Sequence, residues 1–315
     1  MNQKYEIHQP ILVTGAAGQI GGVGFKLVEF LCAKKISVRA MVRRVDDRSQ
    51  ALVNLGAEVV VGDLTDLKDV NRVIKGCRRI YFGMSVSSSY LEATVNVAAI
   101  AKYHGVELFV NISQMTVSEM SVTATTSSPQ QKLQWLSEQV LNWSGLPCVH
   151  VRPTVFLENP LFHQVAANTI RESGEIKLPF GTGRTSPIAS YDVARVLAKI
   201  LSDPAAPHIG KVYELTGLKT QDLKEIAQEY SSALGRPLKY VDMPLEEWGI
   251  RELKPIGLPD HVYNHIYTMA RLHKENRYDR LVNTVEDLTG VKPMSVKDWV
   301  QAHLADFQTS GMNTG

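Results

Sequence analysis

The stretch that decides the fold lies near the start of the chain: Ile11-Leu12-Val13-Thr14-Gly15-Ala16-Ala17-Gly18-Gln19-Ile20-Gly21-Gly22. Its first three residues are apolar and predict a short buried strand. Glycines at positions 15, 18 and 21 then predict a tight turn, and the apolar residues spaced along 25–31 predict a helix. A strand, a glycine-rich turn and a helix in this order are typical of the first half of a dinucleotide-binding unit.

Each glycine of the turn has its own physical role in such a unit. Gly15 lets the chain turn sharply, Gly18 lets backbone N–H groups approach a pyrophosphate, and Gly21 lets the helix pack close to the sheet. An isolated G-x-x-G-x-x-G triplet also occurs in purely structural turns, but the flanking strand and helix favour binding. Gly22 and Gly24 then occupy helical turns where glycine costs about 1 kcal/mol relative to alanine, which indicates that something comes close to this backbone.

Composition excludes several classes of protein. The chain has 315 residues and a net charge of +2, so no basic field indicates binding to nucleic acid or a membrane surface. No apolar run is long enough to span a bilayer, and residues 1–10 lack the apolar core of a signal peptide. Cys32, Cys77 and Cys148 are widely spaced and outside any C-x-x-C pair, which fits a reduced, cytoplasmic protein.

The second predicted strand, residues 36–42, ends in two arginines, Arg43 and Arg44. In an NAD-binding unit a carboxylate near this position takes the ribose 2′-hydroxyl, whereas a guanidinium suits a 2′-phosphate. The arginines therefore favour NADP(H) over NAD(H). The alternative is that both side chains are simply solvated, and Asp46 and Asp47 follow closely enough to weaken the distinction.

Strands and helices continue to alternate through the first half of the chain. Asp63 follows the third predicted strand, where its carboxylate either accepts a hydrogen bond from an adenine amino group or caps the next helix. The alternation predicts an α/β fold of the Rossmann type, a doubly wound parallel sheet with helices on both faces. The further strands are expected at 58–61, 79–83, 107–112 and 148–151, and helices at 91–104 and 129–143.

The alternation breaks after residue 155. We expect a helix at 161–172, a loop at 176–186, a helix beginning at Ser190 and a mostly helical end, with strands at 211–215 and 237–243. These patterns predict two domains. Residues 1–155 with 188–215 form the nucleotide-binding domain, and residues 156–187 with 216–310 form a smaller mixed α/β substrate domain. Residues 311–315 are expected to be frayed.

Several motifs occur together in a fixed order, and as a set they are more specific than any one of them. They are the 14–21 turn, Val42-Arg43-Arg44, Val61-Gly62-Asp63-Leu64, Phe109-Val110-Asn111-Ile112-Ser113, Lys132, Glu138, Ser144-Gly145-Leu146, Val151-Arg152-Pro153, Glu158-Asn159, residues 190–194 and residues 212–217. Together they resemble the NmrA-like branch of the atypical short-chain dehydrogenase/reductases. The resemblance covers nearly the whole chain, and its last third matches only loosely.

The resemblance implies an NADP(H)-binding Rossmann domain followed by a small mixed domain. Members of that family are either reductases of quinones, azo dyes and triphenylmethane dyes or non-catalytic redox sensors. By resemblance, the cofactor pyrophosphate would meet Gly15, Ala17, Gly18, Gln19 and Ile20, and its 2′-phosphate Arg43. Asp63 and Leu64 would contact the adenine. The adenosine side of the site would be lined by Gly83, Met84 and Ser85. Lys132 would contact the nicotinamide ribose. The nicotinamide itself would be flanked by Pro153, Thr154, Val155 and Phe156.

One part of the usual short-chain dehydrogenase machinery is missing. Those enzymes place a tyrosine four residues before a lysine, and the tyrosine acts as the general acid. Lys132 is present here, but residue 128 is a serine, and none of the eleven tyrosines has a lysine four residues later. A serine hydroxyl has too high a pKa to replace a phenol without strong activation. The sequence therefore argues against sugar epimerases and ordinary ketone reductases.

Hydride transfer remains compatible with this loss. Reduction of a quinone or a cationic dye gives a delocalised or neutral product, which needs little help from a local acid, and the cofactor carries the chemistry. Such an acceptor needs a flat apolar pocket. Candidate pocket residues are Met115, Phe156, Phe162, Phe180 and Trp248, for each of which core packing is the alternative.

Two other patterns favour a structural interpretation. His261 and His265 are four residues apart on a predicted helix, but Asp260 is their only evident neighbour of ligand type, so we expect no metal site. The basic residues of 271–280 are interleaved with acidic ones, which predicts a solvated face rather than a nucleic-acid site.

The sequence thus predicts an NADPH-dependent reductase of an electron-poor, planar, apolar small molecule, with Lys132 positioning the nicotinamide ribose. The alternative is an NADP(H)-binding redox sensor that regulates a protein partner without turnover. The polar segment 121–128 suits either a substrate lid or a docking segment. The sequence leaves open a homodimer, a regulatory protein partner and the natural acceptor.

Overall fold

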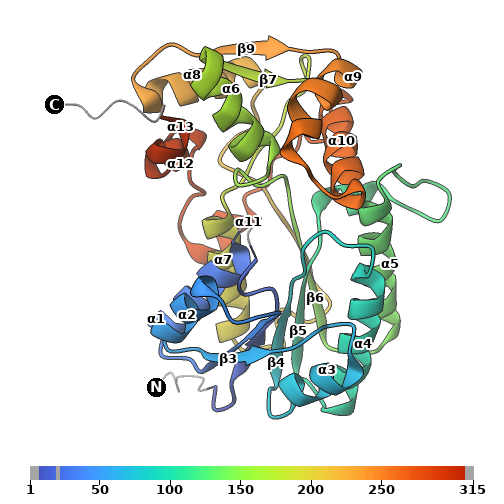
Figure 1. Cartoon of the computed structure of the whole chain (residues 1–315). Helices are drawn as coiled ribbons and strands as arrows, with labels where there is room; N and C mark the ends of the chain where they lie inside the picture. The colour runs from blue at the N-terminus through green and yellow to red at the C-terminus, as the bar shows by residue number, and fades with distance from the viewer. Residues whose placement is uncertain (1–6, 19–21, 309–315) are drawn as a thin grey trace.

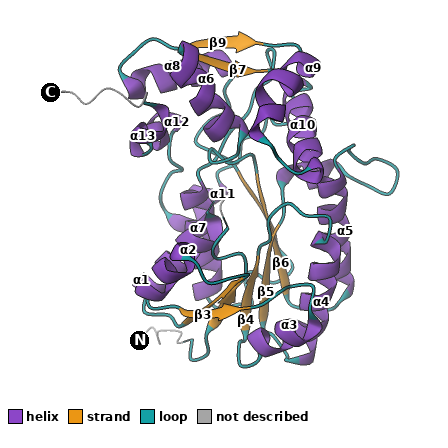
Figure 2. Cartoon of the chain, in the orientation of Figure 1, coloured by secondary structure: helices purple, strands orange, loops and turns teal. Residues whose placement is uncertain are grey.

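The computed structural model describes residues 7–18 and 22–308, and its centre is a parallel sheet (Figures 1 and 2). The strands of this sheet are β1 (Ile11–Val13), β2 (Val38–Val42), β3 (Glu58–Val61), β4 (Arg79–Phe82), β5 (Leu108–Ile112), β6 (Cys148–Pro153) and β8 (Val212–Leu215). Their spatial order is β3-β2-β1-β4-β5-β6-β8, and every neighbouring pair is parallel. The predicted Rossmann-type α/β fold is confirmed, and the chain reverses its direction of winding between β1 and β4.

Helices cover both faces of this sheet, as Figure 1 shows. One face carries α1 (Val23–Ala33), α2 (Asp47–Asn54), α7 (Ser190–Ser202) and α11 (Thr284–Thr289). The other carries α3 (Leu67–Ile74), α4 (Tyr90–Tyr103) and α5 (Pro129–Trp143). The strands are apolar on both sides because a hydrophobic layer of helix packs against each face.

A second, smaller region lies beyond the carboxyl ends of the strands (Figure 1). Its two parallel strands are β7 (Glu175–Leu178) and β9 (Lys239–Asp242). They pack with α6 (Ala166–Ser173), α8 (Leu223–Leu234), α9 (Leu245–Trp248), α10 (Asp260–Lys274), α12 (Val296–Ala302) and α13 (Leu304–Phe307) around a hydrophobic core of their own. The division into domains stays a prediction. In the structure, α11 returns from this region to pack on α7 and β8.

Some predicted elements differ from the observed ones. The loop expected at 176–186 begins as β7, which is stabilised by pairing with a strand more than sixty residues later in the chain. The helix expected at 161–172 starts with a wider π-type turn, Leu161–Val165, before α6. The helix expected at 129–143 has those bounds in the structure. In the described part of the chain, no helix has both the length and the apolar character to cross a membrane.

The two glycines at the start of the first helix are explained by the protein's own backbone. Gly22 is the N-cap of α1 and has a φ of +58°. A Cβ on Gly24 would lie 2.6 Å from the Gly15 carbonyl oxygen, so this glycine lets α1 pack against the turn. That role was expected of Gly21, which lies outside the described residues.

Candidate functional site

The glycine turn brings the ends of β1 and β4 into close contact. Gly15 has a φ of +63°, and a Cβ there would lie 2.6 Å from the carbonyl oxygen of Gly83. Gly83 itself covers the ring of Tyr81, whose hydroxyl oxygen would be 2.5 Å from an added Cβ. Gly15 therefore allows the two backbones to approach, and Gly83 leaves room for the Tyr81 ring; a side chain at either position would block its contact.

The N-terminus of α1 points into this region without a side-chain cap. Its N-cap is a glycine, and its first turn contains no acidic residue. The first backbone N–H groups of a helix have no partner within it, and they carry the positive end of the helix dipole. This arrangement suits a phosphate group.

A cleft with a volume of about 500 Å³ opens along the carboxyl ends of β1, β2 and β4. Eight of the residues predicted to contact the cofactor line it: Gly15, Ala17, Gly18, Arg43, Leu64, Gly83, Met84 and Ser85. Gln19 and Ile20, which were predicted with them, lie outside the described residues. The structure thus brings the predicted adenosine and pyrophosphate contacts together from segments distant in sequence.

Three arginines lie at the mouth of this cleft, including one that the sequence analysis missed. Arg43 and Arg44 are exposed, and Arg48 is half-buried. Arg48 donates a hydrogen bond to the Ala17 carbonyl oxygen at 2.9 Å, so it joins α2 to the glycine turn. Arg48 belongs to the arginine-rich segment that follows β2, and this was the sequence feature that could have identified it as a cleft residue.

The carboxylate of Asp46, which weakened the sequence argument for NADP(H), is engaged in hydrogen bonds within the protein. Asp46 is the N-cap of α2 and accepts hydrogen bonds from the backbone N–H groups of Arg48 and Ser49. Its other oxygen is 2.6 Å from Arg48 Nη2. The hydrogen bonds from the Arg48 side chain and from the Ser49 backbone hold the pKa of Asp46 below its usual value. This carboxylate is therefore poorly placed to take a ribose diol as well.

Asp63 does not cap the next helix, which was one of the two roles expected of it. The N-cap of α3 is Asp66. Asp63 Oδ1 instead accepts hydrogen bonds from the backbone N–H and the hydroxyl of Thr65, both at 2.8 Å, and these lower the pKa of its carboxyl. Asp63 lies between Gly62 and Leu64, both of which line the cleft.

The predicted nicotinamide contacts lie past the end of β6. Pro153, Thr154 and Val155 are buried, and Phe156 is half-buried and pairs with Ile188 in an isolated β-bridge. Thr154 Oγ1 is buried and has no hydrogen-bond partner among the described residues. The same holds for the hydroxyl of Ser113, just past the neighbouring strand β5. Buried polar atoms without a partner are rare, and two of them lie past neighbouring strand ends.

Lys132 is exposed on α5, and within the described chain its ammonium makes no hydrogen bond or ion pair. The serine four residues earlier is fully buried. Ser128 Oγ caps α5 by accepting a hydrogen bond from the Gln131 N–H, and it lies 2.9 Å from His265 Nδ1. Because Ser128 has no exposed surface, this pair ties α10 to α5 and offers no hydroxyl to a substrate.

Most of the residues predicted to line an apolar pocket are buried in the protein. Phe162, Phe180 and Trp248 are at most 1% exposed and pack together in the core of the smaller region. Met115 is also buried, in the 3₁₀ turn Met115–Glu119 that follows β5. Large aromatic residues fill cores more often than they line pockets, and composition alone does not separate the two uses. Phe156 alone of the five is half-buried.

A cluster of glutamines near Met115 was not predicted. Gln114 follows β5, and Gln131 and Gln134 lie one turn apart on α5. Gln131 Nε2 donates to Gln114 Oε1 at 3.3 Å, and Gln114 Nε2 donates to Gln134 Oε1. The i, i+3 spacing of the two helical glutamines was a weak signal, but nothing in the sequence placed Gln114 beside them.

The remaining candidates have structural explanations. His261 Nε2 lies 2.9 Å from Gln130 Oε1, so both predicted histidines face α5. Among the described residues, no group of three or more His, Cys, Asp and Glu side chains is arranged to hold a metal ion. The basic segment 271–280 is not simply solvated, because Arg277 and Arg280 both pair with Glu119.

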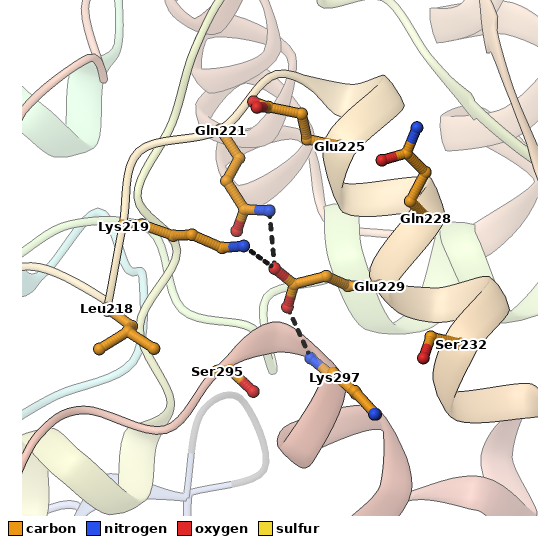
Figure 3. Close-up of a pocket in the computed structure, with 9 residues that line it drawn as sticks. All are labelled: Leu218, Lys219, Gln221, Glu225, Gln228, Glu229, Ser232, Ser295 and Lys297. Carbon is orange, nitrogen blue, oxygen red and sulfur yellow. Dashed lines mark hydrogen bonds and ion pairs between the residues drawn. The ribbon is translucent and has the colours of Figure 1, made fainter.

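A second hollow, of about 470 Å³, lies between α8 and α12 (Figure 3). At its centre, Glu229 accepts hydrogen bonds from the Gln221 side chain at 2.8 Å and from the Lys297 backbone at 2.9 Å. Lys219 Nζ lies 2.6 Å from the same carboxylate. Both oxygens of Glu229 are therefore occupied in joining three segments, which makes this hollow a structural junction.

The comparisons with known proteins agree with this architecture. The model of the NmrA-like family matches residues 8–300. The chain belongs to the NmrA-like family. It is 27% identical over 299 residues to an NAD(P)H azoreductase from Xenophilus azovorans, covering 94% of this chain and 99% of that protein.

Solved structures show the same fold at low sequence identity. An Escherichia coli NADPH-dependent quinone oxidoreductase complexed with NADPH superposes with a TM-score of 0.80 at 24% identity, covering 94% of this chain and 99% of that one. NmrA, a negative transcriptional regulator in complex with NADP, superposes with a TM-score of 0.77 at 15% identity, covering 98% and 99%. The family fold is therefore shared by reductases and by a regulator.

Proposed function

We propose that this member of the NmrA-like family is an NADPH-dependent reductase that transfers hydride to an electron-poor, planar, apolar acceptor of the quinone, azo or triphenylmethane dye type. The observation that carries the proposal is the cleft at the carboxyl ends of β1, β2 and β4. It combines a backbone-only glycine surface, an uncapped helix N-terminus and three arginines. The azoreductase relative supports the reaction class.

The residues of the cleft fit NADP(H) in separate ways. Gly15, Ala17 and Gly18 would let the pyrophosphate approach the backbone and the N-terminus of α1, because no large side chain stands in the way. Arg43 and Arg44, with Arg48 beside them, would bind the 2′-phosphate, since guanidinium groups match phosphate geometry. Gly62 and Leu64 would bound the adenine, next to Asp63.

The other end of the cofactor would lie towards β5 and β6. The buried hydroxyls of Ser113 and Thr154, which have no partner among the described residues, would bond its carboxamide or an ordered water. Lys132 would contact the nicotinamide ribose, because its exposed ammonium is not committed to another described residue. When bound, the reduced cofactor supplies a hydride. A quinone or azo acceptor then takes a proton from solvent, whereas a cationic dye is neutralised by the hydride alone.

The test is NADPH oxidation at 340 nm against a panel of quinones, azo dyes and triphenylmethane dyes. Cofactor binding is followed in the same samples by quenching of tryptophan fluorescence. Turnover of at least one acceptor class, with saturation in NADPH, is the expected result. Tight NADPH binding without turnover of any acceptor would reject the reductase, and absence of NADPH binding would reject the reductase and the redox sensor alike.

A second function is favoured by one observation. In the described structure, three of the four aromatic side chains expected to line an acceptor pocket are packed in a core instead. A redox sensor needs the cofactor cleft and no acceptor pocket, and the NADP-bound transcriptional regulator of the same fold supports that alternative. Such a sensor should bind NADP⁺ and NADPH with different affinity and change its affinity for a protein partner accordingly.

A further inference from the structure

The glutamines Gln114, Gln131 and Gln134, which we call the amide cluster, form a directed chain of hydrogen bonds. Gln131 donates to Gln114, and Gln114 donates to Gln134. Gln134 in turn is hydrogen-bonded to the hydroxyl of Tyr90. Tyr90 donates to the Ile112 carbonyl oxygen at 3.1 Å, so the chain ends on the backbone of β5.

The amide cluster has more donors than acceptors. Its carbonyl oxygens are all used, because Thr126 donates to Gln131 Oε1 and Thr116 donates to Gln114 Oε1 at 3.1 Å. A primary amide carries two N–H donors, and each of the three amides uses one. Every amide nitrogen therefore keeps one N–H without a partner in the described part of the chain.

The cluster lies at the same sheet edge as the cofactor cleft. Gln114 comes two residues after the end of β5, and β5 lies between β4 and β6. Gly83, just past β4, lines the cleft, and Thr154, just past β6, is predicted to flank the nicotinamide. Because the ends of parallel strands share one edge, the amide cluster lies beyond the adenosine end of the cleft, on the nicotinamide side.

No ionised side chain belongs to the amide cluster. The carboxylate of Glu119, at the end of the turn after Gln114, is paired with Arg277 and Arg280. Glu138, one turn further along α5, is paired with Arg152 at 3.0 Å. A neutral site with spare N–H groups is complementary to a carbonyl oxygen, which accepts hydrogen bonds and has none to donate, and it offers nothing to a cation.

From this geometry we infer that Gln134 and Gln114 bind the carbonyl oxygen of an uncharged acceptor and orient it. Gln131 holds Gln114 in place. The inference rests on the proposed reductase function, and it selects carbonyl-bearing acceptors of the quinone type over cationic dyes at that site. The two amides would orient the carbonyl by hydrogen bonding, and they would not replace the tyrosine of other short-chain dehydrogenases as a general acid.

Gln134→Glu tests this with little change in shape. The carboxylate still accepts the hydrogen bond from Gln114 but has no N–H to offer a carbonyl. We use menadione as the neutral carbonyl acceptor and crystal violet as the cationic one. The expected result is a KM for menadione about five- to tenfold higher, with KM for crystal violet unchanged or lower. Gln114→Leu should also raise KM for menadione.

Gln139→Glu is the matched control. Gln139 lies on the same helix and is also half-buried, and its side chain donates only to the Trp135 carbonyl oxygen within the described chain. It should leave both KM values unchanged. Equal effects of Gln134→Glu on both acceptors, or the same effect from Gln139→Glu, would overturn the assignment, because general damage to the helix would explain them.

A measurement of acceptor binding tests this inference separately from the proposed function. Menadione binding to the NADP⁺-loaded protein is measured by equilibrium dialysis, which needs no turnover. If the wild type turns over no acceptor but binds menadione at least fivefold more tightly than Gln134→Glu, the reductase proposal fails and the carbonyl site stands. If the wild type and Gln134→Glu bind menadione equally, or neither binds it, the carbonyl site is wrong, whatever the turnover.

Discussion

Thr14 Oγ1 lies 2.9 Å from both the backbone nitrogen and the carbonyl oxygen of Gly83, so one hydroxyl ties the end of β1 to the end of β4. Thr14→Val keeps the shape of the side chain and removes both hydrogen bonds. Since these groups are buried, we expect a loss of about 1–3 kcal/mol in the free energy of unfolding. Urea denaturation measures it. Thr125→Val, at an exposed position, should cost nothing measurable, and an equal loss there would contradict the role of these hydrogen bonds.

The three arginines at the mouth of the cleft should set the preference for cofactor. Arg43→Ala is expected to weaken NADPH binding roughly 10- to 100-fold, because a charge-assisted hydrogen bond to the 2′-phosphate is lost. NADH lacks that phosphate, so its affinity should change less than twofold. Titration of tryptophan fluorescence with each cofactor measures both. Arg251→Ala, an exposed arginine paired with Glu247, is the control. Equal weakening of both cofactors by Arg43→Ala would show that the 2′-phosphate lies elsewhere.

Glu138 and Arg152 form an ion pair between α5 and β6 that is buried on the glutamate side. Glu138 is 1% exposed, and Arg152 Nε lies 3.0 Å from its carboxylate. Glu138→Ala would leave a largely buried guanidinium without its partner, so we expect a loss of about 3 kcal/mol in stability. Thermal unfolding compares it with Glu92→Ala, an exposed glutamate on α4. A loss under 1 kcal/mol would contradict this.

Two buried histidines should make the protein less stable in acid. Burial, with a smaller contribution from the charge of His261, lowers the pKa of His265 to about 4, and burial lowers the pKa of His273 to about 3. In the unfolded chain both take up a proton near pH ~6.5. Their contribution is therefore complete above that pH and is lost as the pH falls towards 4, by up to about 1.4 kcal/mol per pH unit for each histidine.

Urea denaturation at pH 8, 7.2, 6, 5 and 4 measures this dependence. His265→Gln should flatten the fall in stability between pH 6.5 and 4, because one of the buried histidines that titrate there is removed. The slope above pH 7 should stay the same as in the wild type. An unchanged slope below pH 6.5 would show that His265 is protonated in the folded protein.

Substitution of Lys132 should affect activity without affecting stability. Its side chain is exposed and has no partner among the described residues, so Lys132→Ala should change the free energy of unfolding by less than about 0.5 kcal/mol. If it contacts the nicotinamide ribose, the same change should lower the rate of NADPH oxidation at least tenfold. Lys224→Ala, on the exposed side of α8, is the control. Wild-type turnover in Lys132→Ala would exclude Lys132 from the site.

The sequence predicted the fold of the parallel sheet and its helices well because the signals for these elements are local. The glycine turn, the strand ends and the capped helices each depend on residues close together in the chain. Even so, the position of Asp46 in the sequence weakened the prediction of NADP(H). Only the structure shows that its carboxylate caps α2 and binds Arg48. The side-chain partner of a charged residue depends on its rotamer, which spacing does not fix.

The smaller region was predicted less well because its contacts are distant in sequence. Phe162, Phe180 and Trp248 are apolar in any environment, so nothing in the chain distinguishes a core position from a pocket wall. The strand β7 was not predicted, because its partner β9 follows in the sequence only after two intervening helices, α7 and α8. The amide cluster likewise requires β5 to be placed beside α5.

The central claim is that the cleft binds NADP(H), and calorimetric titration of the purified protein with NADPH and, separately, NADH tests it most directly. The account predicts binding of NADPH with one site per chain and a dissociation constant in the micromolar range or tighter, with NADH at least tenfold weaker. Absence of heat from NADPH at millimolar concentration, or equal affinity for NADH, would contradict the assignment of the glycine turn and the arginines.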